Sequence, residues 1–163
     1  GFGNSPFGEA LVAWNRRGVS FLGFCHATGR ETAKADLRSR WPGAALTSDD
    51  SGAEKLLYSI FEKAGAEPIS VWLRGSPFQL KVWEALLKVP RGRLCSYQDL
   101  AQLMGRPSAT RAVASAVAAN HIAYLIPCHR VIGADGSLAG YSAGPEIKKR
   151  LLRHEAGRRY SKS

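Results

Sequence analysis

The sequence predicts an α/β (α+β) fold: a small amino-terminal mixed α/β domain with a short antiparallel sheet, followed by a mostly helical domain that contains a helix-turn-helix. Three observations predict this class. Strand-like apolar runs and helix signals are mixed in the first half, helix signals follow one another in the second, and the composition changes at Gly75–Ser76–Pro77. The 163 residues suit one or two small domains, which we place at 1–74 and 75–163.

A hairpin and one further strand are predicted in the first domain. Leu11–Trp14 and Val19–Cys25 are apolar runs, and Asn15–Gly18 between them has the composition of a turn. Ile69–Leu73 has the pattern of another strand.

Capping signals predict two helices between these strands. Thr28 with Glu31 matches a capping box, and Ser51 with Glu54 repeats it. The apolar positions of the second helix lie on one face; they are Leu56, Leu57, Ile60, Phe61 and Ala64. Gly65 is expected to end that helix.

Helix signals follow closely in the second domain. Ser76 is expected to cap a helix whose first turn contains Pro77. Ser96 is expected to cap a helix over Tyr97–Met104, and a helix over Ser108–Ala119 follows a glycine-containing turn. Two short helices around such a turn form a helix-turn-helix pattern.

The last part of the chain predicts a strand, a loop and a helix. Ile122–Ile126 is an apolar, strand-like segment, and a turn-rich loop with several glycines follows it. Pro145 is expected to open a final helix that Gly157 ends. The inward positions of this helix are Ile147, Leu151 and Leu152.

Positive charge is concentrated in the second domain. Residues 1–75 hold nine Lys/Arg and eight Asp/Glu, a net of +1, whereas residues 76–163 hold fourteen and five, a net of +9. A basic half beside a nearly neutral half suggests a polyanion-binding domain joined to a scaffold. A basic surface without a partner is an equal alternative on charge alone. We find no apolar run long enough to cross a membrane and no signal peptide.

Three cysteines are the candidate reactive groups. The odd count and wide spacing of Cys25, Cys95 and Cys128 argue against a disulfide framework and favour a reducing, cytoplasmic setting. Cys25 lies in an apolar strand and is expected in the core. Cys128 lies between Pro127, which restricts the backbone, and His129, which can lower the pKa of a thiol if the two side chains meet.

Residues 127–131, Pro-Cys-His-Arg-Val, resemble the active-site signature of the O6-alkylguanine-DNA alkyltransferases, also called methylated-DNA–protein-cysteine methyltransferases. The resemblance covers Gly75–Gly157; its other motifs are Ser96–Ala101, Arg111–Val113, Asn120, Gly140–Ser142 and Leu151–Glu155. Residues 1–74 are similar in pattern only to the family's amino-terminal, ribonuclease-H-like domain. Within the family the resemblance is strongest to the carboxy-terminal part of the bacterial adaptive-response protein, and a start without Met fits a segment of such a regulatory fusion.

The resemblance implies direct-reversal DNA repair. A monomer would bind double-stranded DNA in the minor groove, flip out O6-alkylguanine and transfer the alkyl group to Cys128 once, without a cofactor or a metal. We expect the Cys128 sulfur to be ionised and to face a cavity that an extrahelical purine can enter. His129 would activate Cys128 through a bound water, and Glu155 would orient His129. Asn120 would hold the helix-turn-helix against the active-site loop.

The remaining roles also come from the resemblance. Tyr97 would donate a proton to the departing guanine, and Arg111 would enter the base stack. The implied DNA contacts are Arg111, Ala112, Ala114, Ser115, Ala116 and Arg130. The implied guanine pocket consists of Val131, Tyr141 and Ser142. The chain departs from many relatives at His121, where they carry Pro. Relatives with Trp at the acceptor position cannot transfer, and Cys128 places this chain outside that group.

Two other functions remain open from the residues. One is a DNA-binding regulator without chemistry, in which Cys128 could be replaced without loss. The other is a cysteine hydrolase, which would turn over repeatedly and need an oxyanion site.

Overall fold

Residues 1–73 together with 121–125 form one unit of the computed structural model, and residues 74–120 with 126–163 form a second. Residues 1–26, 28–63, 66–138 and 140–160 are described by the structure. The division after Leu73 lies beside the boundary expected from the sequence, but His121–Leu125 groups with the first unit and not with the second. Within the described residues, no helix is long and apolar enough to span a bilayer.

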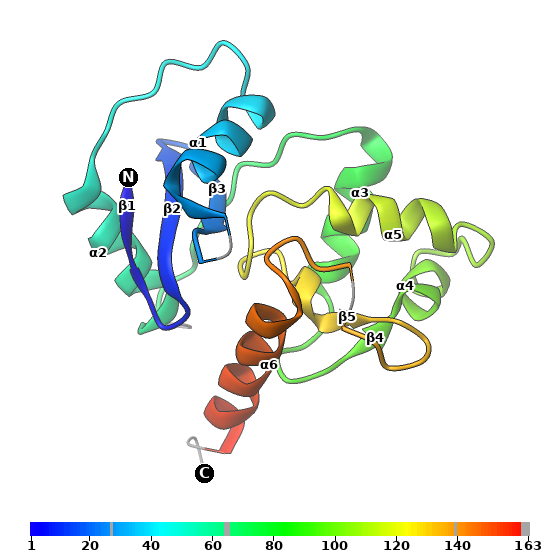
Figure 1. Cartoon of the computed structure of the whole chain (residues 1–163). Helices are drawn as coiled ribbons and strands as arrows, with labels where there is room; N and C mark the ends of the chain where they lie inside the picture. The colour runs from blue at the N-terminus through cyan, green and yellow to red at the C-terminus, as the bar shows by residue number, and fades with distance from the viewer. Residues whose placement is uncertain (27, 64–65, 139, 161–163) are drawn as a thin grey trace. The chain divides into compact units, whose positions relative to one another are not determined.

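Three antiparallel strands form the sheet of the first unit (Figure 1). β1 (Phe2–Ser5), β2 (Gly8–Asn15) and β3 (Gly18–Phe24) lie in that order. The predicted hairpin is confirmed, and the side chain of Asn15 accepts a hydrogen bond from the backbone N–H of Arg17 at 2.8 Å in its turn. β1 was not predicted.

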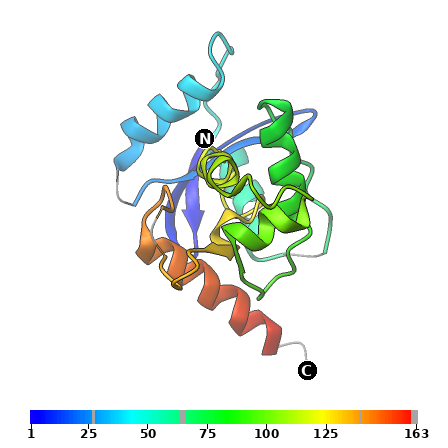
Figure 2. The same cartoon turned by 90° about the vertical axis from the view of Figure 1, so that its right-hand side faces the viewer.

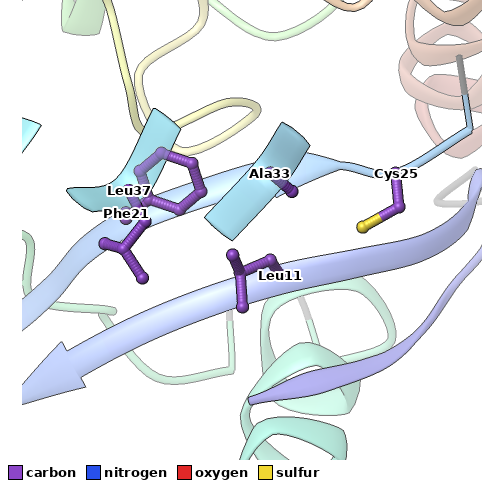
Figure 3. Close-up of a cluster of buried hydrophobic side chains, with 5 residues drawn as sticks. All are labelled: Leu11, Phe21, Cys25, Ala33 and Leu37. Carbon is purple, nitrogen blue, oxygen red and sulfur yellow. The ribbon is translucent and has the colours of Figure 1, made fainter. Parts of the chain in front are cut away.

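Helices cover both faces of this sheet. Neighbouring side chains of β2 point to opposite faces, yet Ala10 and Leu11 are only 0% and 3% exposed. On the face of Leu11, α1 (Gly29–Arg40) closes a cluster that Figure 3 shows; its members are Leu11, Phe21, Cys25, Ala33 and Leu37. On the other face, the ring of Phe24 lies 6.3 Å from that of Phe61 in α2 (Asp50–Phe61). Cys25 is therefore a core residue, as predicted.

The two capping boxes predicted for these helices are wrong. Thr28 occupies the N-cap of α1, but its side chain makes no capping hydrogen bond, and Glu31 pairs with a lysine instead. α2 begins one residue before Ser51 and is capped by Asp49, whose carboxylate accepts from the N–H of Gly52 at 2.8 Å. The real cap lies two residues upstream because Asp is as good a cap as Ser. Ala64 and Gly65, assigned to the end of α2, lie outside the described residues.

Both expected strands outside the hairpin are reduced to single bridges. Val71 pairs in parallel with Val19, and Ile122 pairs in parallel with Leu22. The predictions of strands over Ile69–Leu73 and over 122–126 are therefore wrong in extent, because an apolar run does not by itself supply a neighbouring edge to pair with.

Three helices form the body of the second unit. α3 (Pro77–Leu87), α4 (Tyr97–Leu103) and α5 (Thr110–Ala118) pack against one another (Figures 1 and 2). The caps predicted at Ser76 and Ser96 are confirmed, and each is part of a full capping box. The buried indole of Trp83 on α3 donates to the carbonyl oxygen of Ala116 on α5 at 2.9 Å. The predicted pair of consecutive helices is present, within two residues at each end.

The remaining elements lead to the end of the chain. A 3-10 turn (Cys128–Arg130) precedes β5 (Val131–Ile132), which pairs in parallel with β4 (Cys95–Ser96). α6 (Pro145–Tyr160) starts at the predicted proline, but Gly157 lies within it, so the predicted helix end is wrong.

Candidate active site

Cys128 is held by a side chain from the end of α5. Asn120 donates from Nδ2 to Cys128 Sγ at 3.1 Å and to the carbonyl oxygen of Ile126 at 3.0 Å. Asn120 comes just after Ala119, the C-cap of α5, and Cys128 opens the 3-10 turn before β5. One amide therefore ties the helix-turn-helix to the segment that carries the thiol, as expected for Asn120.

Burial is the largest influence on the pKa of the Cys128 thiol. Cys128 is 7% exposed, and desolvation raises the pKa of its thiol above the ordinary value of 9.0. The amide of Asn120, the ammonium of Lys148 and the hydroxyl of Tyr141 act in the opposite direction but do not outweigh burial. The expectation of an ionised sulfur is therefore wrong for the chain without a ligand: the thiol is protonated at neutral pH.

A small hollow adjoins the sulfur. Its lining residues are Tyr97, Val117, Ala118, Cys128, Gly140, Tyr141, Ser142 and Lys148. Its volume of about 10 Å³ suits a single water molecule. The structure thus brings Tyr97, Tyr141 and Ser142 to Cys128, as expected, but the expected purine-sized cavity is absent from this part of the described chain.

The hydroxyls of the two tyrosines of this hollow are protonated at neutral pH, because the pKa of each is raised. Burial is the largest cause that raises the pKa of Tyr141 well above 10.0, and the Cys128 sulfur adds to it. The pKa of Tyr97 is raised for the same two reasons, to a smaller extent. Gly140 has a positive φ of 84°, and a Cβ there would lie 3.6 Å from the Tyr97 hydroxyl. The loop thus approaches Tyr97 with its backbone in a conformation that glycine favours.

His129 and Glu155 form a fully buried pair. Nε2 of His129 lies 2.8 Å from Oε1 of Glu155, and both side chains are 0% exposed. Glu155 reaches His129 from α6, as the sequence predicted. Hydrogen bonds from His129 and Arg130 overcome desolvation and lower the pKa of Glu155 to about 2. Desolvation lowers the pKa of His129, so its imidazole is neutral at pH 7 and donates from Nε2 to the carboxylate.

Arg130 is turned toward the same carboxylate. Its Nε lies 3.0 Å from Oε2 and its Nη2 2.7 Å from Oε1 of Glu155, and Nη1 donates to the carbonyl oxygen of Val89 at 2.6 Å. The side chain is 11% exposed. The expectation that Arg130 contacts DNA needs correction, because its guanidinium is engaged inside the unit.

Lys148 is a site residue that the sequence did not reveal. It lies on α6, is 1% exposed and donates from Nζ to the carbonyl oxygen of Val131. Val131, which was expected to line the guanine pocket, is itself fully buried, and its carbonyl oxygen accepts this hydrogen bond. Lys148 lies three and four residues before Leu151 and Leu152, which were expected to face inward, so a lysine at that spacing was the signal that could have found it.

α5 presents part of its predicted DNA-contacting set to solvent. Arg111, Ala112 and Ser115 are exposed, and Ala114 is partly exposed. Ala116 is only 3% exposed and its carbonyl accepts from Trp83, so its assignment as a DNA contact needs correction. The helix is rotated so that Ala116 faces α3.

The site contains groups that can exchange protons. Among the residues that the structure describes, no three His, Cys, Asp or Glu side chains lie close enough together to hold a metal ion. All three cysteines are free. The arrangement of a thiol, a buried His–carboxylate pair and donors that face the sulfur suits nucleophilic attack by sulfur.

Comparison with known proteins identifies the family. Residues 77–157 match a family model described as 6-O-methylguanine DNA methyltransferase, DNA binding domain. Over 86% of its length, the chain is 42% identical to the inducible methylated-DNA–protein-cysteine methyltransferase of Bacillus subtilis, of which it covers 80%. The chain belongs to the methylated-DNA–protein-cysteine methyltransferase family. This membership agrees with the resemblance of residues 127–131 and with the α+β fold predicted from the sequence.

Members of the methyltransferase family differ in length. The chain is 39% identical over 91% of its length to the Escherichia coli bifunctional transcriptional activator/DNA repair enzyme Ada, but spans only 43% of that protein. Among solved structures, Mycobacterium tuberculosis OGT in complex with DNA matches with a TM-score of 0.75 and 36% identity, covering 96% of this chain and 92% of that one.

Proposed function

We propose that this chain repairs DNA by moving the alkyl group of O6-alkylguanine to the sulfur of Cys128. The observation that carries the proposal is the Cys128 thiol bound by Asn120 at 3.1 Å, in the unit that also buries the His129–Glu155 pair. Membership of a family whose members are named for methyl transfer from DNA to cysteine supports the reaction class. A free thiol is essential, so the reaction belongs in a reducing compartment such as the cytoplasm.

The transfer is a displacement at the alkyl carbon. The S–C bond forms as the bond from carbon to O6 breaks, and the electron pair of that bond stays on guanine. His129 takes the thiol proton through a bridging water, and Tyr97 gives a proton to the departing guanine. The proton on His129 then returns to Tyr97 through solvent, so thiol and alkylguanine become thioether and guanine. Because a thioether is stable, each chain reacts once.

The donors around the sulfur stabilise the thiolate in this step. Asn120, Lys148 and Tyr141 all lower the pKa of the Cys128 thiol, while burial raises it. Once His129 has accepted the proton, these groups face a full negative charge in a dry site, where their interaction is strongest. The resting chain therefore keeps an unreactive thiol that ionises when the reaction begins.

α5 is the element that meets DNA in this proposal. Its exposed small side chains, Ala112 and Ser115, permit close approach to the minor groove, and the exposed Arg111 fills the gap left by the flipped nucleotide. The related M. tuberculosis protein was crystallised with DNA, which supports DNA as the partner. Phosphate contacts by the basic second half need little sequence readout, as a damage scanner requires.

A base can enter only after the hollow opens. About 10 Å³ of space beside Cys128 holds one water and no purine. We propose that the segment Gly140–Ser142 moves away from Tyr97 when the flipped base arrives. Tyr141 and Ser142 then line the guanine pocket.

Mass spectrometry tests the function directly. After incubation of the chain with duplex DNA that carries O6-methylguanine, we expect a gain of one methyl group, located on Cys128 by peptide mapping. Cys128→Ser should gain none and still bind DNA. A DNA-binding regulator would leave Cys128 unmodified under excess substrate, and a cysteine hydrolase would release product beyond one equivalent; either outcome would refute the proposal.

A further inference from the structure

The guanidinium of Arg130 closes a buried network that connects three parts of the second unit. The carboxylate of Glu155 accepts from two nitrogens of Arg130, Nε and Nη2, from His129, and from the backbone N–H of Gly92 at 3.4 Å. The remaining arm of Arg130 donates to the carbonyl oxygen of Val89, beyond the end of α3. One arginine thus fixes the position of Glu155, and Glu155 fixes His129.

From this geometry we infer that Arg130 is a positioning residue of the transfer reaction, which holds the Glu155 carboxylate against His129, and that it makes no contact with DNA. The inference rests on the proposed function for the reaction itself. A bidentate arginine suits this task because its planar fork orients both oxygens of the carboxylate.

The charge of Arg130 matters as much as its geometry. The ionised groups that act on His129 are Glu155, which favours the imidazolium, and Arg130 and Lys148, which oppose it; burial opposes it most. Without Arg130, the carboxylate of Glu155 would hold the proton on the imidazole to higher pH, so a smaller fraction of His129 would be free to accept the proton of Cys128. The second cation on the carboxylate therefore preserves the basic form of His129.

The variant Arg130→Gln tests this role. The variant Arg111→Gln, which removes an exposed arginine of α5, is the comparison. We expect Arg130→Gln to raise the pKa of His129 in histidine NMR titrations and to move the acid limb of the transfer rate to higher pH. Its rate at pH 7 should fall by about tenfold or more, since a positioned general base contributes about 10²–10⁴-fold. Its affinity for duplex DNA and the slope of that affinity against salt should stay at the wild-type values.

Arg111→Gln should give the opposite result: weaker DNA binding, a salt slope smaller by about one, and an unchanged His129 titration. Arg153→Gln, which removes an exposed charge from α6, controls for net charge and should change none of these quantities. A loss of DNA affinity and salt slope in Arg130→Gln, with His129 titrating as in the wild type, would overturn the inference.

Arg130→Lys separates charge from geometry and serves if Arg130→Gln fails to fold. It keeps the cation but loses the fork, so the acid limb should stay near its wild-type pH while the rate falls less than in Arg130→Gln. A lysine variant with the shifted limb of the glutamine variant would contradict the role assigned to charge. If the wild-type chain transfers no methyl group, the proposed function fails, yet the His129 titration and the DNA affinities still decide the role of Arg130.

Discussion

Asn120 donates to the sulfur of Cys128 at 3.1 Å and to the carbonyl oxygen of Ile126 at 3.0 Å, so that one side chain both stabilises the thiolate and fixes the backbone that precedes it. The helix that ends at Ala118 and the turn that begins at Cys128 are joined through this amide. A change at the end of α5 therefore has a short covalent and hydrogen-bonded route to the Cys128 sulfur.

Asn120→Ala should raise the pKa of the Cys128 thiol further and slow methyl transfer by about 10- to 10²-fold, because a donor to the developing thiolate is lost. The pH dependence of iodoacetamide labelling, followed by peptide mass spectrometry, measures the thiol. Asn15→Ala is the matched control, since it removes an amide that holds only a hairpin turn. Equal labelling curves for Asn120→Ala and the wild type would contradict this assignment.

Lys148→Met should slow transfer by about tenfold, because the buried ammonium lowers the pKa of the thiol. Its free energy of unfolding should change by less than about 2 kcal/mol: the carbonyl oxygen of Val131 loses its donor, but a buried charge is also removed. Single-turnover kinetics and urea denaturation measure the two effects. Lys149→Met removes the exposed neighbouring lysine and should leave both unchanged; transfer at the same rate in the two variants would exclude a role for Lys148.

Glu155→Gln should make the free energy of unfolding depend less on pH in the acid range. The folded-state pKa of Glu155 is about 2 against an ordinary 4.5, so its contribution of roughly 3 kcal/mol is present above pH 4.5 and is lost as the pH falls through 2. The lowered pKa of His129 acts in the same direction below about pH 6.5, because the unfolded chain takes up its proton first.

Urea denaturation of the wild type and of Glu155→Gln at pH 7, 5 and 3 checks this sign. The variant should be less stable by about 3–5 kcal/mol at pH 7, since Arg130 and His129 lose their carboxylate, and the two curves should approach each other toward pH 3. Parallel curves over the whole range would show that Glu155 does not carry the acid sensitivity.

Ser76→Ala should cost about 1 kcal/mol of stability, because the Ser76 side chain accepts a capping hydrogen bond from Gln79 at 3.1 Å. Thr28 occupies the equivalent N-cap position of α1, but its side chain makes no capping hydrogen bond. Thr28→Ala should therefore lower the free energy of unfolding by only a few tenths of the loss expected for Ser76→Ala. Chemical denaturation of the two variants compares them directly. A loss at Thr28 as large as that at Ser76 would mean that α1 is capped in solution.

The sequence predicted what local rules determine. The hairpin around Arg16–Arg17 and the caps at Ser76 and Ser96 depend on residues within a few positions of one another, and all three are present. The capping boxes at Thr28 and Ser51 failed because the same spacing of residue types occurs without the hydrogen bond, and a competing aspartate lay just upstream. β1 escaped prediction because four residues carry too little pattern.

The sequence predicted the site residues that the family motif names. It did not predict which way the side chains of their neighbours point in the folded unit. Asn120 contacts the Cys128 sulfur, and Glu155 contacts the ring of His129, which are the two contacts expected from the resemblance. Arg130 and Ala116 were assigned to DNA, but rotation of their elements turns both inward, which only tertiary packing determines. The thiol was expected to be ionised, yet desolvation, a property of the packed unit, outweighs its donors.

The hydrogen bonds that Glu155 receives bridge wide gaps in the sequence: 63 residues separate it from Gly92, and 26 separate it from His129. Loop closure over such distances comes late in folding, after local helices and turns have formed. Glu155 lies on α6, so during synthesis His129 stays without its carboxylate partner until residue 155 has left the ribosome. A nascent chain can therefore expose Cys128 and His129 for some time before the buried His129–Glu155 pair forms.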